Sequence, residues 1–594
     1  MELESFSEEG RIVLSKEEFC EKVKNNDFKD NENYIIQEEI SVHKKHKDIF
    51  NGNSIILKSI EIKNVLFKEN VSFQELNIEL PFKFINCIFS KIFSLNQIIN
   101  QNTISTEAHY FFYFESCKIK LFSLLNKSKI SKPIYFENSF LEQLSIIDSE
   151  IVSDSGLFEY QIGLFIKKTE VKNQIDLIKS GFGVIQIYDN SIINCNSFKI
   201  NNVNILDLEF TNSSFKGDIE VINSEITKTL YLYDNTFQER PMILNTTINQ
   251  FNCIQNEFKK GLTFHFRERN YDTFDMILLS SKFLEPFYFE GKILIKKLLF
   301  SFSSKNEGII KFSNIKVNSL SLNGVNNDLL LILKNTILQN IEFKDFVNKN
   351  SLMFQNCQTI YKESSLKIID SDLGDTKFND FSFKSFKEIQ IENSFINEIK
   401  TSNVEWFEDE QLTTNSEDAF KTQRNKREIY KQLKQALESN GNKIDSLLFK
   451  SREKKTYQEE LKLSNKAKYD DRFILWVGSI NNHGQSWLKA LWILLIVNFL
   501  FYAILILPFS KEFTFSFAEN WNDLESSFHQ VFNTKSWKLY FQLLNPTRKL
   551  STLYGFTDKN SITTGVVILD IFQRLVLGIF YFQIIQAFRK FVGK

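Results

Sequence analysis

A short phrase recurs about every eleven residues through the middle of the chain, and this repeat constrains the fold more than any other feature. Examples of the phrase are IYDNSI, FTNSSF, VINSEI, LYDNTF, ILNTTI and IQNEF. Its turn positions are spaced by 12, 10, 11, 12, 10 and 11 residues and are Asn190, Asn202, Asn212, Asn223, Asn235, Asn245 and Asn256. The same period is found at Asn64, Glu75, Asn86, Ser116, Lys127, Asn138 and Ser149, and more loosely at Asn314, Asn323, Asn335, Asn356 and Asn393.

Each phrase predicts a short strand followed by a turn. Apolar residues alternate before the Asn, as at Leu230 and Leu232, which is typical of a strand with one buried face. Asn then turns the chain, because its side chain can bond the nearby backbone and it tolerates left-handed angles. We therefore predict a mainly β fold, a right-handed β-solenoid with about 22 residues per coil, over residues 50–415. The alternatives are a globular β-sandwich for the fold and a polar binding ladder for the Asn column.

The composition supports a solenoid. The 594 residues include only 19 Gly and 6 Pro, so Asn takes over the turns, and they include 61 Phe, which we expect to fill the stacked core. The net charge of -1 excludes a strongly basic nucleic-acid binder, so no nucleic-acid partner is expected. The six Cys residues form no CxxC or other metal-ligand spacing, and we interpret them as small core residues of a reducing compartment.

Helical segments are predicted before and after the repeats. Residues 1–49 are expected to form an N-terminal cap with a helix from Leu14 to Val23, in which Ser15 is the N-cap and Glu18 completes a capping box. Residues 416–486 are expected to form a helical linker. Its pattern predicts an αα-hairpin, with helices from about Glu417 to Ser439 and from about Lys443 to Leu463.

The last part of the chain, residues 487–594, is predicted to be a membrane domain that contacts the lipid bilayer. Two apolar segments, near residues 487–507 and 562–588, are long enough to span it. Basic residues after the second span place the C-terminus in the cytoplasm, and two spans place the solenoid on the same side. The segment between the spans lies outside or folds back into the membrane, and WKLYFQLL within it is a candidate for the interface.

The second span is more polar than an anchor requires. Asp570, Gln573, Arg574 and Tyr581 fall within roughly 100° of one another on a helix, and the Asp570–Arg574 spacing allows an ion pair. Ionisable residues inside a span usually face a bundle interior or water, which favours a homo-oligomer in which this face lines a pore or packs against neighbours. The alternative is a span that begins near Leu575. Asn498 in the first span is interpreted as a helix–helix contact.

The order of these parts resembles the pentapeptide-repeat membrane proteins of bacteria that carry a C-terminal two-helix, ion-channel-like module. The residues that carry the resemblance are YFENSF and FINCIF, the segment FKTQRNKREIYKQLKQALESNGN, then HGQSWLKALWILLIVNFLFY and FQIIQAFRKF. The segment STLYGF has a Tyr-Gly pair without the preceding Gly of a potassium filter. The resemblance implies a location in the bacterial inner membrane.

Two functions are consistent with these features. The first is an oligomeric membrane protein in which a cytoplasmic solenoid senses or assembles and two spans form a pore or channel-like effector, in a stress response or in phage defence. The alternative is a membrane-tethered scaffold whose solenoid binds a protein partner without conducting. No P-loop, GxGxxG, GxSxG or HExxH motif occurs, so no catalytic residue, cofactor or metal is predicted, and the chain is not expected to be an enzyme.

Overall fold

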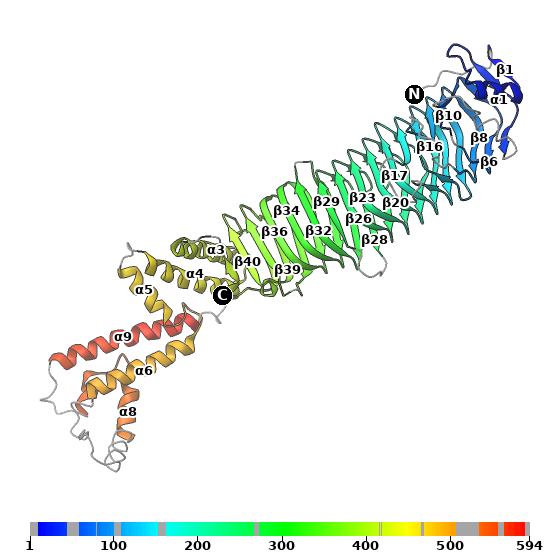
Figure 1. The fold of residues 1–594 in the computed structure, drawn as a ribbon. Coiled ribbons are helices and arrows are strands. Elements are labelled where there is room, and N and C mark those ends of the chain that lie inside the picture. The colour runs from blue at the N-terminus through cyan, green and yellow to red at the C-terminus, as the bar shows by residue number, and fades with distance from the viewer. Residues whose placement is uncertain are drawn as a thin grey trace. The chain divides into compact units, whose positions relative to one another are not determined.

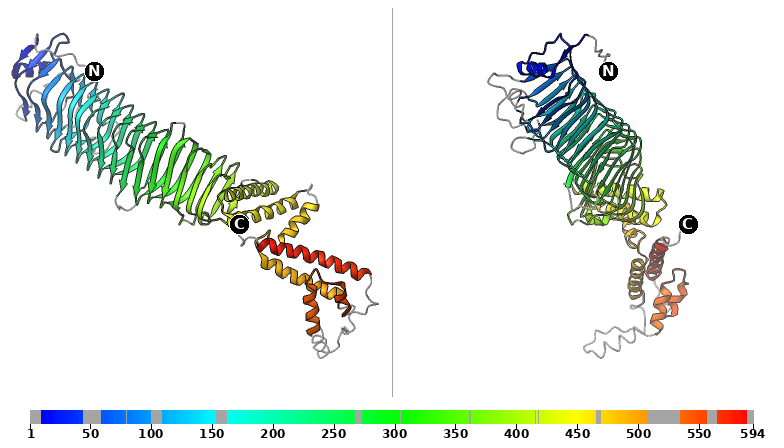
Figure 2. Two further views of the ribbon diagram at one scale, coloured as in Figure 1. Left: turned by 180° about the vertical axis from the view of Figure 1, so that it is seen from behind. Right: turned by 90° about the vertical axis from the view of Figure 1, so that its right-hand side faces the viewer.

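The chain forms two compact units in the computed structural model (Figure 1). The first unit contains Met1–Phe395 and Ile399–Thr413, and the second contains Ile396–Glu398 and Thr414–Lys594. The structure describes residues 10–43, 59–78, 80–99, 109–152, 162–266, 273–303, 305–360, 362–414, 416, 418–464, 469–506, 534–555 and 564–588. The first unit is built mainly from strands and the second from helices (Figures 1 and 2).

The first unit is a β-solenoid of about 16 turns with a spacing of about 22 residues. One coil consists of β22 (Asp218–Ile222), β23 (Glu225–Tyr233) and β24 (Thr236–Phe237), which are joined by short turns. The strands belong to two sheets of 24 and 18 strands, and β24 pairs in parallel with β27 (Glu257–Phe258) of the next coil. Because each strand pairs with one about a coil later, the predicted solenoid is confirmed and the β-sandwich alternative is excluded.

Residues in the left-handed conformation make the turns. Asn212, Asn223 and Asn245 have φ angles of 46°, 49° and 48°, and positive φ is found at all but four of the predicted turn positions. Side chains of the turn column also bond one another. The Asn335 amide donates to Asn314 Oδ1 (3.1 Å), and the Asn356 amide donates to Asn335 Oδ1 (2.9 Å). These bonds between coils favour a structural role for the Asn column over a binding ladder.

The prediction was wrong at the other four turn positions. At three of them the preceding residue has the positive φ, namely Asp148, Asp234 and Gln255 in place of Ser149, Asn235 and Asn256. In these three pairs the first residue makes the turn and the second is buried in the core. The fourth, Asn323, lies inside β34 (Lys316–Asn326), and Gly324 beside it has a φ of 84°.

Small polar side chains form a second column just inside the turns. The Ser139 hydroxyl donates to the Glu137 carbonyl (2.9 Å) and accepts from the Cys117 N–H of the preceding coil (3.0 Å). In the same position, Asn256 Oδ1 accepts from the Asn235 N–H (3.0 Å), and both side chains are buried. This ladder satisfies backbone N–H groups that the turns remove from the sheets. The buried, free Cys87, Cys117 and Cys357 each follow a turn residue in the same way.

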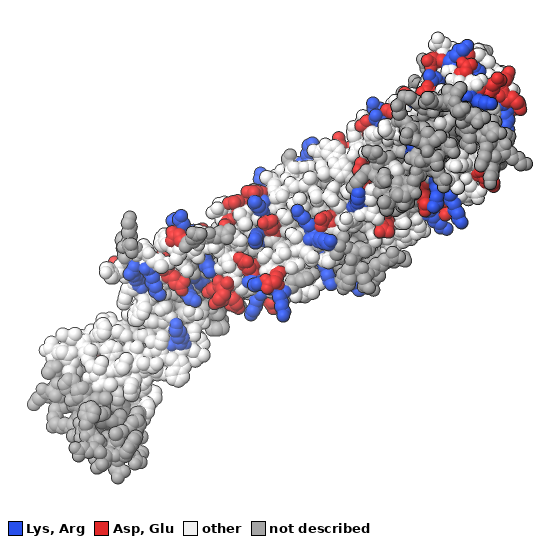
Figure 3. Space-filling view, in the orientation of Figure 1, with Lys and Arg blue, Asp and Glu red and all other residues white. Residues whose placement is uncertain are grey.

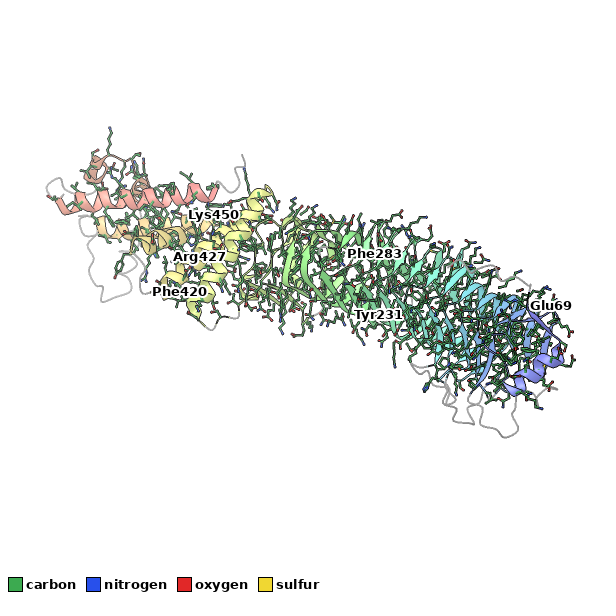
Figure 4. All side chains as sticks on the ribbon, turned by 90° about the horizontal axis from the view of Figure 1, so that it is seen from above. Glu69, Tyr231, Phe283, Phe420, Arg427 and Lys450 are labelled. Carbon is green, nitrogen blue, oxygen red and sulfur yellow. The ribbon has the colours of Figure 1, made fainter. Side chains whose placement is uncertain are left out.

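The solenoid core contains stacked Phe rings. Phe215, Phe237, Phe258 and Phe283 lie on successive coils, with ring centroids separated by 4.9, 4.8 and 4.9 Å. These separations match the spacing between paired strands, so the same residue on successive coils stacks face to face. Phe283 is labelled in Figure 4. The stacks explain much of the Phe excess.

The solenoid begins before residue 50. Strands β1 (Ile12–Leu14), β2 (Tyr34–Ile36) and β3 (Ile40–His43) already pair within its first sheet, inside the range predicted as a separate cap. The predicted helix is α1 (Lys16–Asn25), and its Ser15–Glu18 capping box is confirmed. Phe19 of α1 contacts the core ring of Phe67 at 5.6 Å. The helix therefore covers the first coil. The last strand is β42 (Leu412–Thr413).

The second unit contains the predicted αα-hairpin, formed by α3 (Ala419–Ser439) and α4 (Lys443–Leu463). The two helices are joined by ion pairs from Arg427 to Glu460 (3.1 Å) and from Lys434 to Glu453 (2.7 Å), and Arg427 is labelled in Figure 4. A helix that the sequence pattern did not reveal, α5 (Tyr469–Ser479), follows. The remaining helices among the described residues are α6 (Trp487–Ile506), α8 (Thr534–Leu543) and α9 (Thr564–Phe588), with a 3-10 segment, η4 (Leu550–Gly555), before α9.

Candidate functional site

Two helices of the second unit are long and apolar enough to cross a membrane. Windows of α6 and α9 have mean hydropathies of 2.0 and 1.8, and only 22% and 28% of their residues are buried. The core helix of a soluble protein would be mostly buried. The exposed side chains are large and apolar: Trp492, Ile496, Phe499, Leu500 and Ile504 on α6, and Ile568, Ile571, Phe572, Leu575, Ile579, Phe582 and Ile585 on α9. Figure 3 shows this part almost free of charged residues, whereas both signs are mixed over the solenoid.

Polar side chains gather on the inner side of these helices. Asn498, Asp570 and Gln573 have 0–1% of their surface exposed, and Arg548, from the segment between α8 and η4, has 6%. The Arg548 guanidinium donates to both Asp570 Oδ1 and Gln573 Oε1, the latter at 2.7 Å. Gln573 Nε2 donates in turn to Asn498 Oδ1 (3.0 Å). Arg574 Nη2 pairs with the other Asp570 oxygen at 2.7 Å. We call these five residues the polar cluster.

Side chains of α6, of α9 and of the segment after α8 also complete the C-terminal end of α8. The last carbonyl groups of a helix have no partner within the helix, and in an apolar environment they must find one elsewhere. Three side chains supply it. They are Asn498 Nδ2, which donates to the Tyr540 carbonyl (3.1 Å), Arg548 Nη1, which donates to the Leu543 carbonyl (2.9 Å), and the Tyr581 hydroxyl, which donates to the Leu544 carbonyl (2.9 Å).

Helix α8 packs against α6, and its C-terminal end lies beside the α6–α9 pair. Leu539 and Leu543 pack with Val566 near the start of α9, while Leu544 packs in a cluster with Leu577. Leu577 lies 13 residues after Thr564, or about 20 Å along the helix axis. The chain therefore descends through α8 to about the middle of α9 and returns through residues 545–555. Residues 534–555 thus fold back along the α6–α9 pair, and their entry into a membrane stays a prediction.

Four of the five predicted site residues, Asn498, Asp570, Gln573 and Arg574, lie together in the polar cluster, and all of these but Arg574 are buried. Asp570, Gln573 and Asn498 are bonded within one chain, and the predicted Asp570–Arg574 pair is present. Tyr581 lies apart from them, on Leu544. Asn498 of α6 and Arg548, which follows α8, cover Asp570 and Gln573 of α9, so in this structure these two residues do not line an open path. Helix α9 is continuous from Thr564, including Asp570.

Sequence reasoning missed Arg548. It lies in LNPTRKL, outside both apolar segments, and 22 residues separate it from Asp570. The sequence did contain one signal, because an acidic residue inside an apolar span needs a basic partner. Several basic residues of the intervening segment could have supplied that partner. Only the fold selects Arg548.

A turn before α6 joins the hairpin to α9. The Asn481 amide donates to the Gln583 carbonyl of α9 (2.8 Å), and the Ser451 hydroxyl of α4 donates to the Asn482 carbonyl (2.8 Å). His483 in this turn is buried, and its ring nitrogens have no hydrogen-bond partner among the described residues. Burial, reinforced by nearby lysines, lowers the pKa of His483 to about 4. The turn therefore contains a neutral imidazole at pH 7.

Other chemistry was sought across the described residues. In that part of the chain no group of three or more His, Cys, Asp or Glu side chains is placed to hold a metal ion. Comparisons with family models, curated proteins and solved structures gave no match. The resemblance to pentapeptide-repeat membrane proteins therefore stays a prediction.

Proposed function

We propose that this chain is an integral membrane protein whose second unit is the subunit of an oligomeric pore, and whose β-solenoid senses a signal or organises the assembly. In this proposal α6 and α9 cross the bacterial inner membrane, and the solenoid and the C-terminus lie in the cytoplasm. A design of this kind could serve a stress response or phage defence.

The observation that carries the proposal is the re-entrant α8 with its polar cluster. Burying ionised groups in an apolar environment is costly, and two apolar helices would anchor a protein without them. Here Arg548 binds Asp570 and Gln573 of α9, and these bonds hold the segment 545–555 beside the apolar helices α6 and α9. Within a bilayer, non-helical backbone is tolerated where it is buried in protein or lines a water-filled cavity. The cluster thus supports a function that needs this segment inside the membrane.

An oligomer is required for conduction. Asn498 and Gln573 have no exposed surface, so one copy encloses no water path at the cluster. The outer faces of α6 and α9 are apolar and can contact lipid or neighbouring copies. A path would then form between copies, beside the segments that return from α8.

The second candidate is the membrane-tethered scaffold. The bonds of the polar cluster also favour this candidate, because nearly every polar group of the cluster has a partner within one chain. A closed module of this kind would anchor the solenoid, which would then bind a protein partner.

Oligomeric mass and ion flux distinguish the two candidates. The full chain, purified in detergent, is measured by light scattering and then reconstituted into liposomes loaded with a halide-sensitive dye and, separately, a potassium-sensitive dye. The pore predicts a defined oligomer and flux in one of the two assays. Monomers with no flux of either ion would contradict the pore and leave the scaffold. The exposed-site variant Lys538→Gln should behave as the parent protein does.

A further inference from the structure

The charges of the polar cluster do not balance. Arg548 and Arg574 share a single carboxylate, that of Asp570, so the cluster carries a net charge of +1. The other described residues of 487–594 do not correct this. Residues 487–506, 534–555 and 564–588 contain one acidic residue, Asp570, against six basic ones: Lys489, Lys535, Lys538, Arg548, Lys549 and Arg574. An excess positive charge is therefore built into the described part of the module.

Both guanidinium groups of the cluster have a buried Nε without an acceptor, but the Arg574 side chain is partly exposed and that of Arg548 is not. The Arg548 guanidinium bonds Asp570, Gln573 and two carbonyl groups, whereas Arg574 has Asp570 as its one partner among the described residues. Its Nε is buried without a hydrogen-bond acceptor, and 26% of the side chain is exposed. A guanidinium has five N–H donors, so Arg574 can bind an acceptor that arrives from outside the chain.

The position of Arg574 limits what that acceptor can be. Helix α9 has 25 residues, and Arg574 lies two residues, or about 3 Å along the axis, from its middle residue, Val576. If α9 spans the bilayer, as the proposed function requires, Arg574 lies close to the midplane. A lipid phosphate remains at the membrane surface, roughly 15 Å from the midplane of a 30 Å hydrocarbon core. Within residues 487–506, 534–555 and 564–588, a second copy has no free carboxylate to offer, because both oxygens of Asp570 are already bound.

We propose that Arg574 binds a small monovalent anion in transit, and that the pore selects anions over cations. This inference rests on the proposed function. The positive charge near the midplane attracts an anion and repels a cation, and the low dielectric constant there strengthens both effects. Arg548 adds to the selection, because it occupies the C-terminal end of α8, where the helix dipole would otherwise stabilise a cation.

The test is ion selectivity in planar bilayers of zwitterionic phosphatidylcholine, which add no net lipid charge. Currents from the reconstituted full chain are recorded under a potassium chloride gradient. We expect the reversal potential to shift from zero toward the equilibrium potential of chloride. Arg574→Gln should lower the chloride-to-potassium permeability ratio by about tenfold. Arg574→Lys should retain the selectivity because it keeps the charge, and Lys538→Gln, which removes a charge from an exposed position on α8, should leave it unchanged.

The outcomes separate the two levels of the proposal. A reversal potential of zero, or one shifted toward the equilibrium potential of potassium, would overturn anion selection but not the proposed pore. Full selectivity in Arg574→Gln would overturn the assignment to Arg574. Absence of current from an inserted protein would instead overturn the pore. If Arg574→Gln does not assemble, the parent protein and Arg574→Lys still decide the sign of the selectivity.

Discussion

Replacing Asp570 by Ala should destabilise the second unit strongly. The side chain is 1% exposed and accepts from two guanidinium groups, so its removal leaves positive charge buried without a counterion. Breaking a buried ion pair in this way costs about 3–5 kcal/mol. Arg574 is partly exposed and can turn toward water, so most of the cost arises at Arg548, whose side chain is 3% exposed.

Tryptophan fluorescence isolates the second unit in this experiment. Five of the six Trp residues belong to it, namely Trp476, Trp487, Trp492, Trp521 and Trp537, whereas Trp406 belongs to the solenoid. For a unit of this size, 3–5 kcal/mol corresponds to a decrease in Tm of roughly 6–20 °C. The far-UV circular dichroism of the strands should change little, because the solenoid does not contain the mutation.

Two further variants make the result interpretable. Asp470→Ala removes an exposed carboxylate from the start of α5 and should change stability by less than about 1 kcal/mol. The double variant Arg548→Met/Asp570→Leu removes both buried charges, and it should be more stable than Asp570→Ala by about 1 kcal/mol or more. An Asp570→Ala variant that melts with the Asp470→Ala control would refute the reasoning, because the cluster would then not hold the unit together.

Three other predictions follow from the contacts. Asn498→Leu leaves the Tyr540 carbonyl without its side-chain donor and should lower the stability of the second unit by about 1–3 kcal/mol, measured by Trp fluorescence in detergent. Phe237→Ala opens a cavity in the ring stack and should cost the solenoid about 3–5 kcal/mol by circular dichroism, whereas the 38%-exposed Tyr233 should tolerate Ala. Since the pKa of His483 is lowered to about 4, the unfolded state binds the proton more readily, so stability should fall as the pH decreases from about 6.5 to 4. His483→Gln should flatten that decrease in the Trp-detected Tm, and an unchanged pH profile would contradict the assignment.

The solenoid was predictable because its information is local. A polar residue that tolerates positive φ, at intervals of about eleven, is enough to give strands, turns and coils, as Asn212 and Asn223 show. The exact turn residue was predicted wrongly where the local pattern allows two choices. In the pairs Asp234–Asn235 and Gln255–Asn256 either residue can make the turn, and the choice depends on which one fits the inner ladder.

The polar cluster was only partly predictable. Helical geometry places Asp570, Gln573 and Arg574 on one face without reference to any other segment. What that face contacts depends on the segment that follows α8, whereas the pattern of α8 itself predicts only an interfacial helix. Arg548 joins the cluster through a turn with no periodic pattern. Whether a polar helical face meets water, a neighbouring copy or its own chain is a tertiary property that periodicity does not encode.

The most direct test of the account is a cryo-EM map of the full chain in lipid nanodiscs. The account predicts a closed ring of copies, with α6 and α9 crossing the lipid belt, α8 ending inside it, and Arg548 on Asp570 in each copy. A single isolated copy in each nanodisc, or an α8 that lies outside the belt and away from α9, would contradict it.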